Sequence, residues 1–176
     1  MKHYLAVDIG GTFVKFGIID EQASIQKIGK VKTPKTLEGL LDLVGSNYKN
    51  YPEIVGVAIS CPGAVSESGM VYGTSALPYI HGPNVKQLLS KRLGLPVYME
   101  NDANCAGYAE VWKGKARGRK DVLIVVIGTG VGERLLRMES FTKVPICMEA
   151  SSDIWLYLIV RELILIHGAQ LLLLAH

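Results

Sequence analysis

The segment covering residues 4–20 constrains the fold of this chain more than any other. An apolar run ends at Asp8 and Ile9, the turn Gly10-Gly11-Thr12 follows, and a second run is rich in β-branched and aromatic residues. This pattern predicts a β-hairpin. Both glycines lack a Cβ, so the backbone there can adopt unusual dihedral angles and come close to a ligand. The N–H groups of the turn and the Thr12 hydroxyl suit phosphate oxygens. Taken alone, however, the pattern is better explained as an ordinary Gly-Gly hairpin with a capping Asp.

The composition bounds the class of protein. The chain has 176 residues, 49% hydrophobic and 20% charged, which predicts one globular domain, or one lobe of a two-lobed protein. A net charge of +3, with no long run of Lys or Arg, argues against nucleic-acid binding. Cys61, Cys105 and Cys147 are far apart and form no Cys-x-x-Cys pair, which favours a reducing compartment and no zinc site in this chain. No signal peptide precedes the first strand, so we expect a cytoplasmic protein.

Strands alternate with helices after the initial hairpin. We expect strands at 24–33, 53–60, 70–73, 95–100 and 122–127, and helices at 37–48, 84–93 and 101–112. Asn84 is expected to cap the second helix, and Leu93-Gly94 to end it. This order predicts an α/β fold in which a mixed sheet is flanked by helices.

Two Gly/Thr turns, at 8–12 and 128–132, each follow an apolar strand. A pair of such turns, far apart in sequence, is what a clamp on a nucleotide's phosphates needs. Between them, Asn101 and Asp102 close a strand and open a helix. An acidic residue at a helix N-terminus is stabilising in itself, so a structural role for Asp102 stays open. Near a phosphate clamp, the same carboxylate can accept a hydroxyl proton as that oxygen attacks a γ-phosphate, while Asn101 positions the substrate.

Four segments together resemble the signatures of ROK (repressor, ORF, kinase) sugar kinases. They lie in order over residues 1–132: Asp8-Ile9-Gly10-Gly11-Thr12, Ser60-Cys61-Pro62-Gly63, Glu100-Asn101-Asp102-Ala103-Asn104 and Ile127-Gly128-Thr129-Gly130-Val131-Gly132. The resemblance implies one lobe of an actin-like ATPase (ribonuclease H-like) fold, with ATP and the sugar bound in the cleft between two lobes. The segment 75–79 is similar to members that act on glucose or β-glucosides. Family regulators carry an N-terminal helix-turn-helix domain, for which the sequence before His3 leaves no room, so we do not expect a repressor.

The resemblance also implies a role for each matching residue. Asp102 would be the catalytic base and Asn101 a sugar ligand, and the turn of Pro62 and Gly63 would border the sugar pocket. The implied phosphate-binding residues are Asp8, Gly10, Gly11 and Thr12 in the first loop and Gly128, Thr129 and Gly130 in the second. ATP and Mg²⁺ are the implied cofactors, with Asp8 as the metal ligand. One departure is Phe13, where many family kinases carry Lys; Lys15 is expected to face the other way and is given no role.

The ROK pattern stops after Gly132. The expected glycine, strand, sugar-binding Glu and cysteine-rich zinc site are absent, and residues 154–166 are apolar almost throughout. That stretch is too short and too charged for a membrane span, and a buried helix explains its composition. Back-translation offers a sharper explanation: if one G was lost just after the Gly132 codon, restoring it gives a ROK-like continuation that includes Gly-Glu-Phe-Gly. In the restored frame, Met138-Glu139 and Met148-Glu149 each dictate Gly, and Cys147-Met148 dictates His or Tyr.

We therefore expect an N-terminal kinase lobe at 1–132 and an out-of-frame apolar tail at 133–176, with the C-terminal lobe missing. The strand at 122–127 would then lose the neighbour that normally follows it, and the tail would expose apolar patches. The full-length ancestor would move the γ-phosphoryl group of Mg-ATP to a hexose hydroxyl, whereas the truncated chain would be weakly active or inactive.

Two other functions stay open. One is a non-catalytic sugar- or nucleotide-binding fragment, and the other is a partner-binding protein whose apolar tail is an interface. We expect sugar and ATP as partners and no membrane. The resemblance allows a homodimer, and the sequence does not predict which sugar is used.

Overall fold

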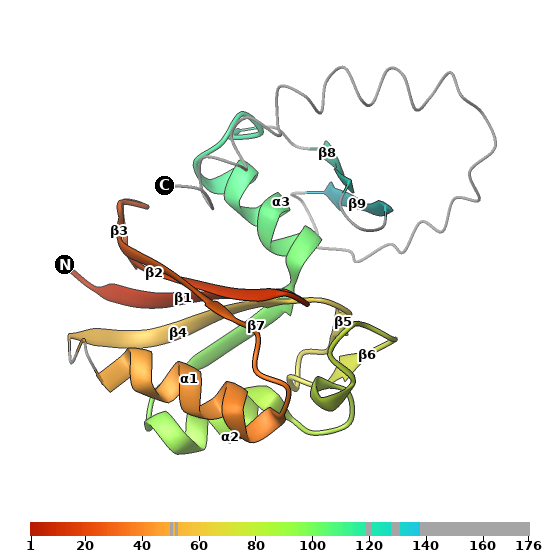
Figure 1. The fold of residues 1–176 in the computed structure, drawn as a ribbon. Coiled ribbons are helices and arrows are strands. Elements are labelled where there is room, and N and C mark those ends of the chain that lie inside the picture. Colours follow the sequence, from red (N-terminus) through yellow and green to blue (C-terminus); the bar gives the residue numbers. More distant parts are fainter. Residues whose placement is uncertain (50, 52, 119–120, 128–130, 138–176) are drawn as a thin grey trace. The chain divides into compact units, whose positions relative to one another are not determined.

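The computed structural model describes residues 1–49, 51, 53–118, 121–127 and 131–137 (Figure 1). The chain divides into two compact units, Met1–Asp102 and Ala103–His176. Within the described ranges, no helix has the length and hydropathy needed to cross a membrane.

The first unit is built on a mixed five-stranded sheet with the strand order β3-β2-β1-β4-β7. The strands are β1 (His3–Ile9), β2 (Phe13–Asp20), β3 (Ile25–Lys32), β4 (Ile54–Cys61) and β7 (Val97–Asn101). β1 pairs antiparallel with β2 and parallel with β4, and β4 pairs parallel with β7. The carboxyl ends of β1, β4 and β7 therefore meet at one edge of the sheet. The predicted initial hairpin is confirmed as β1 and β2.

Two helices, α1 (Leu37–Lys49) and α2 (Val85–Leu93), cover one face of this sheet (Figure 1). The Asn84 side chain caps α2 by accepting a hydrogen bond from the Gln87 N–H, and Gly94 ends the helix at a φ of 67°. Both predicted boundaries of α2 are thus confirmed. The connection from β4 to α2 contains β5 (Ala64–Val65), β6 (Val71–Tyr72) and the 3₁₀ helix η1 (Pro78–Ile80). The strand expected at 70–73 is β6, whereas η1 was not predicted.

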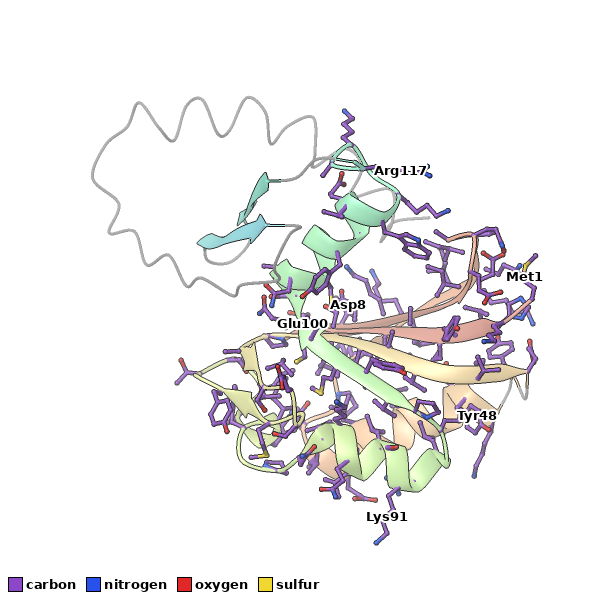
Figure 2. All side chains as sticks on the ribbon, turned by 180° about the vertical axis from the view of Figure 1, so that it is seen from behind. Met1, Asp8, Tyr48, Lys91, Glu100 and Arg117 are labelled. Atoms are coloured by element: carbon purple, nitrogen blue, oxygen red, sulfur yellow. The ribbon has the colours of Figure 1, made fainter. Side chains whose placement is uncertain are left out.

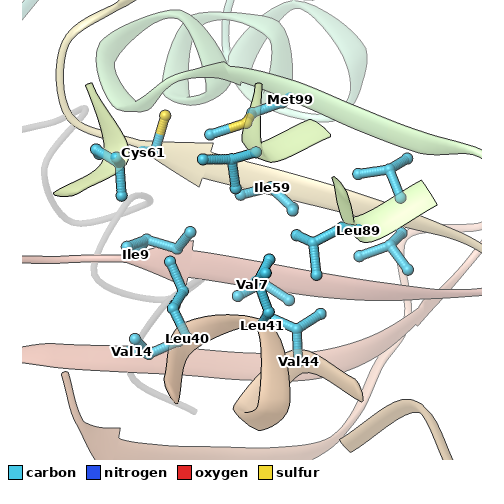
Figure 3. Close-up of a cluster of buried hydrophobic side chains, with 14 of the residues drawn as sticks. Val7, Ile9, Val14, Leu40, Leu41, Val44, Ile59, Cys61, Leu89 and Met99 are labelled. Carbon is cyan, nitrogen blue, oxygen red and sulfur yellow. The ribbon is translucent and has the colours of Figure 1, made fainter. Parts of the chain in front are cut away.

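The core of the first unit lies between the sheet and these two helices (Figure 3). Alternate strand residues point into it, as the two-residue period of a strand requires. The buried set includes Leu5, Val7 and Ile9 of β1, Val57, Ile59 and Cys61 of β4, and Leu40, Val44 and Leu89 of the helices. Residues of the opposite parity, Asp8, Ser60 and Glu100, are half-buried on the other face. The same alternation that fills the core thus places polar groups together at the carboxyl edge.

The second unit contains all of α3 (Asp102–Trp112) except its first residue. A hairpin of β8 (Asp121–Ile127) and β9 (Val131–Arg137) follows the helix in the sequence. The expectation that the strand at 122–127 has no following neighbour is wrong, because β8 pairs antiparallel with β9 along its whole length. Strand pairing uses backbone groups, so the change of side-chain pattern at Glu133 does not prevent it. The boundary predicted at 132/133 lies inside β9, and the rest of the predicted tail, 138–176, lies outside the described residues.

Candidate active site

The turn of Gly10, Gly11 and Thr12, called here the glycine turn, joins β1 to β2. Its ends are fixed, because the Gly10 N–H donates to the Phe13 carbonyl at 3.0 Å and the Thr33 hydroxyl donates to the Gly10 carbonyl at 2.6 Å. In the described part of the chain, the N–H groups of Gly11 and Thr12 donate to no protein acceptor. These two successive amides, in a turn held by its carbonyls, are chemically able to donate hydrogen bonds to an anion such as phosphate.

The two glycines are needed for space. Neither has a positive φ, so the left-handed backbone conformation that favours glycine is used at neither position. A Cβ on Gly10 would lie 2.9 Å from the Phe13 carbonyl oxygen, and one on Gly11 would lie 3.0 Å from the Cβ of Ala76. Other parts of the same chain, Phe13 and Ala76, therefore approach the two glycines so closely that neither position has room for a side chain.

The Asp8 carboxylate, one residue before β1 ends, is held from both sides. Ser60 Oγ donates to its Oδ1 at 3.0 Å, and Lys15 Nζ lies 3.7 Å from its Oδ2. Both contacts follow from the strand register, in which Asp8 lies opposite Lys15 on β2 and opposite Ser60 on β4. The expectation that Lys15 faces away is wrong, because Phe13 and Lys15 are two residues apart on one strand and share a face.

A second group of polar side chains lies where β7 passes into α3. Asn101 Nδ2 donates to the Gly63 carbonyl and to Asp102 Oδ1, both at 2.9 Å. Gly63 has a φ of 95°, which a residue with a Cβ rarely adopts, so the turn after Pro62 requires glycine here. Asp102 is exposed and is the first residue of α3. The side-chain amide of Asn101 thus brings three of the predicted site residues, Gly63, Asn101 and Asp102, into contact.

Both groups lie at the same edge of the sheet, and Figure 2 shows Asp8 and Glu100 at the same end of their strands. Asp8 lies beside Ser60 in the register, and Ser60 lies beside Glu100. Two strand spacings place Asp8 about 10 Å from Glu100 across the sheet. Asp102 follows Glu100 by two residues, so one edge carries the glycine turn, Asp8 and the proposed base. The second predicted loop, Gly128, Thr129 and Gly130, lies outside the described residues.

Three polar contacts of this edge were not predicted. Ser60 lies in the Ser60-Cys61-Pro62-Gly63 motif, but the motif does not predict its hydrogen bond to Asp8. The sequence pattern likewise does not predict the contacts of Lys15 with Asp8 and of Thr33 with Gly10. Counting the register outward from the hairpin turn would have paired Asp8 with Lys15. No sequence signal links Thr33 to Gly10, because that contact depends on the path of the chain after β3.

The fold and the site together are typical of one class of protein. This class has a mixed α/β lobe of actin-like type, with a glycine turn and acidic residues at the strand ends of one sheet edge. The ROK family model then matches residues 4–136, and the chain belongs to the ROK family. The predicted family and fold class are thereby confirmed.

Several relatives of this chain are named as sugar kinases. It is 36% identical over 132 residues to the glucokinase of Streptomyces coelicolor, a match that covers 73% of this chain and 41% of the relative. It is 35% identical over 133 residues to the β-glucoside kinase of Klebsiella pneumoniae, covering 72% and 43%. A ROK glucokinase of Streptomyces griseus, solved with glucose and AMPPNP, matches with a TM-score of 0.70 at 31% identity, over 80% of this chain and 49% of that one. The chain spans less than half the length of these relatives.

Proposed function

We propose that this chain carries the first phosphate-binding loop and the catalytic base of an ATP-dependent hexose kinase. The observation that carries the proposal is the shared sheet edge: the Asn101 amide holds Asp102 there, beside a glycine turn with two amides available to an anion. The relatives named glucokinase and β-glucoside kinase support a sugar as the acceptor. The glucose and AMPPNP in the Streptomyces griseus structure support ATP as the donor.

In the proposed reaction, the amides of Gly11 and Thr12 bind phosphate oxygens of ATP, and Gly128, Thr129 and Gly130 complete the clamp. Asp102 accepts the proton of a sugar hydroxyl as that oxygen bonds to the γ-phosphorus, and the bond from phosphorus to the leaving ADP oxygen breaks. Asn101 fixes the orientation of the Asp102 carboxylate. Asn101 and the turn of Pro62 and Gly63 also contact the sugar and hold its hydroxyl in line.

Asp8 fits the role of a magnesium ligand. Proteins commonly bind Mg²⁺ through one or two carboxylates together with substrate phosphates. The described residues contain no group of three or more His, Cys, Asp or Glu side chains that could hold a metal by themselves, so the phosphates would complete the coordination. Ser60 and Lys15 hold the Asp8 carboxylate in place for this role. When bound, Mg²⁺ would neutralise charge on the phosphates.

We also propose that residues 133–176 are an out-of-frame tail and that this chain transfers phosphate weakly or not at all. The ROK-like reading of the restored frame supports this, and the family match ends at residue 136, four residues into the proposed tail. Sequencing the coding DNA across the Gly132 codon tests the idea. A downstream frame with no ROK-like translation would contradict it.

A coupled assay of ADP release, run with a panel of hexoses, tests the kinase proposal. It is applied to this chain and to the frame-restored protein, each with and without Asp102→Ala. Loss of a general base is expected to lower turnover of the restored protein by about 10²–10⁴-fold, while sugar affinity stays near that of the unaltered protein. Near-normal turnover in the Asp102→Ala variant would show that Asp102 is not the base.

A second candidate is a non-catalytic sugar- or nucleotide-binding fragment. The observation that favours it is the short span of the chain, which covers 41% of the glucokinase relative. The same assay separates the two candidates. The kinase proposal predicts that the frame-restored protein releases ADP. The second candidate predicts that neither this chain nor the frame-restored protein releases ADP, although sugar or nucleotide binds.

A further inference from the structure

We propose that Thr33 is the positioning residue that orients the phosphate-binding amide of Gly11. The inference rests on the proposed role of the glycine turn in binding phosphate. Thr33 follows β3 directly and contacts the turn from a distance of 23 residues in sequence.

Thr33 donates hydrogen bonds to the carbonyls of both neighbours of Gly11 in the sequence, Gly10 and Thr12. Its hydroxyl donates to the Gly10 carbonyl at 2.6 Å, and its N–H donates to the Thr12 carbonyl at 3.0 Å. The Gly10 carbonyl and the Gly11 N–H belong to one planar trans peptide group, in which they point in opposite directions. Because the carbonyl points toward Thr33, the Gly11 N–H points away from it. The Thr33 hydroxyl thereby sets the direction in which this amide can meet a phosphate oxygen.

The chain just after Thr33 is also held by a hydrogen bond, so the residue that orients the turn is itself fixed in place. The Tyr79 hydroxyl donates to the carbonyl of the next residue, Pro34, at 2.5 Å. The hydroxyl is protonated at neutral pH and can donate, and burial, which raises the pKa of Tyr79 above its ordinary value of 10.0, extends this into more alkaline solution. The segment that bears Tyr79 also contributes Ala76, the residue that closes the space next to Gly11.

The glycine turn has little rigidity of its own. Gly10 and Gly11 have no Cβ to restrict their backbone, so their peptide groups turn easily when no hydrogen bond fixes them. Removing the Thr33 hydroxyl would leave the Gly10 carbonyl without this donor and free the Gly11 amide to rotate. The loss should therefore appear in phosphate binding as well as in stability.

Thr33→Val removes the hydroxyl and keeps the shape of the side chain. The matched control is Thr36→Val, the same substitution three positions away. Thr36 Oγ1 accepts a hydrogen bond from the Gly39 N–H at 3.2 Å, so the control also loses one hydrogen bond but none to the turn. Thr33→Ser keeps the donor and should restore most of the binding.

The test measures the affinity of the full chain for Mg-ATP and for tripolyphosphate, a probe that carries phosphates alone. Thr33→Val should weaken both by about tenfold, as the loss of one oriented hydrogen bond predicts. Thr36→Val and Thr33→Ser should stay within about threefold of the unaltered chain. Equal affinity in Thr33→Val and the unaltered chain, or an equal loss in Thr33→Val and Thr36→Val, would overturn the proposal. If Thr33→Val does not fold, Tyr79→Phe replaces it, and unchanged binding in that variant would overturn the proposal instead.

A second measurement separates this proposal from the proposed function. If the unaltered chain binds neither probe, the phosphate-binding role fails, and the positioning role is read from the backbone ¹H–¹⁵N resonance of Gly11. Thr33→Val should shift that resonance clearly more than Thr36→Val does. An unshifted resonance would refute the positioning role in its own right.

Discussion

Replacing Asp8 by Asn removes one negative charge from the proposed phosphate site without changing the size of the side chain. The amide oxygen of Asn can still accept the hydrogen bond that Ser60 Oγ makes to Oδ1 at 3.0 Å. The ion pair with Lys15, at 3.7 Å, is lost. Asp8→Asn therefore tests the charge of this position while leaving most of its packing in place.

The expected cost in stability is small. A hydrogen bond to a charged acceptor contributes about 1.5–3 kcal/mol and one to a neutral acceptor about 0.5–1.5 kcal/mol, a difference of about 1 kcal/mol. The Lys15 and Asp8 side chains are 38% and 24% exposed, and a pair at this exposure contributes at most about 1 kcal/mol. The free energy of unfolding should thus fall by about 1–2 kcal/mol, which leaves most of a typical domain's stability intact.

The expected effect on nucleotide binding depends on magnesium. With Mg²⁺ present, Asp8→Asn should weaken ATP binding about tenfold or more, because a hard oxygen ligand of the metal loses its charge. With EDTA in place of Mg²⁺, the variant should bind ATP as well as the unaltered chain or better, because repulsion between the carboxylate and the phosphates is gone. Titration calorimetry under both conditions measures the two affinities.

The matched control is Asp42→Asn on α1. Asp42 also pairs with a cation, Arg92, at 2.9 Å, but its side chain is 65% exposed on the opposite face of the sheet from Asp8. This control should change ATP affinity in neither condition. A loss in Asp8→Asn that is equal with and without Mg²⁺, or no loss with Mg²⁺, would refute the metal-binding role.

The remaining predictions concern the proposed base, the core and the pH response. Asn101→Ala removes the amide that joins Asp102 to the Gly63 carbonyl, so turnover of the frame-restored protein should fall by about tenfold or more; unchanged steady-state kinetics would show that the amide does not position the base. Leu40→Ala empties a fully buried position in α1 and should lower the free energy of unfolding by about 2–5 kcal/mol in urea titrations; a loss below about 1 kcal/mol would contradict the described packing. Because the pKa of Tyr79 is raised on folding, its contribution to stability is complete below the unfolded value of 10.0 and is lost as pH rises through the folded value. Tyr79→Phe should therefore reduce the fall in melting temperature between about pH 9 and 11, and an identical pH profile would contradict this.

The elements that the sequence predicted well are those with local signals. The Gly10-Gly11-Thr12 turn between two apolar runs is enough to predict the hairpin, because strand period and turn chemistry are encoded within a few residues. The same is true of α2, where Asn84 supplies the cap and Gly94 the left-handed residue that ends the helix. Such features need no knowledge of the rest of the chain.

The contacts that were missed depend on how distant segments meet. Ser60 reaches Asp8 across 52 residues and Thr33 reaches Gly10 across 23, and neither distance has a periodic signal in the sequence. The strand β9 was missed for a different reason. The change in side-chain pattern at Glu133 suggests that the sheet ends there, although strand pairing depends on backbone groups. Local chemistry thus predicted several residues that meet at this edge of the sheet, whereas the strand register determined which neighbours hold them.

The proposed phosphate site is tested most directly by titrating the ¹⁵N-labelled chain with Mg-AMPPNP and following each backbone amide. The amides of Gly11 and Thr12 should show the largest shifts in the first unit, and the same titration with Asp8→Asn should require a higher nucleotide concentration. If the largest shifts fall on residues away from the carboxyl edge of β1, β4 and β7, or if no amide of the glycine turn responds, the nucleotide does not bind at the proposed site.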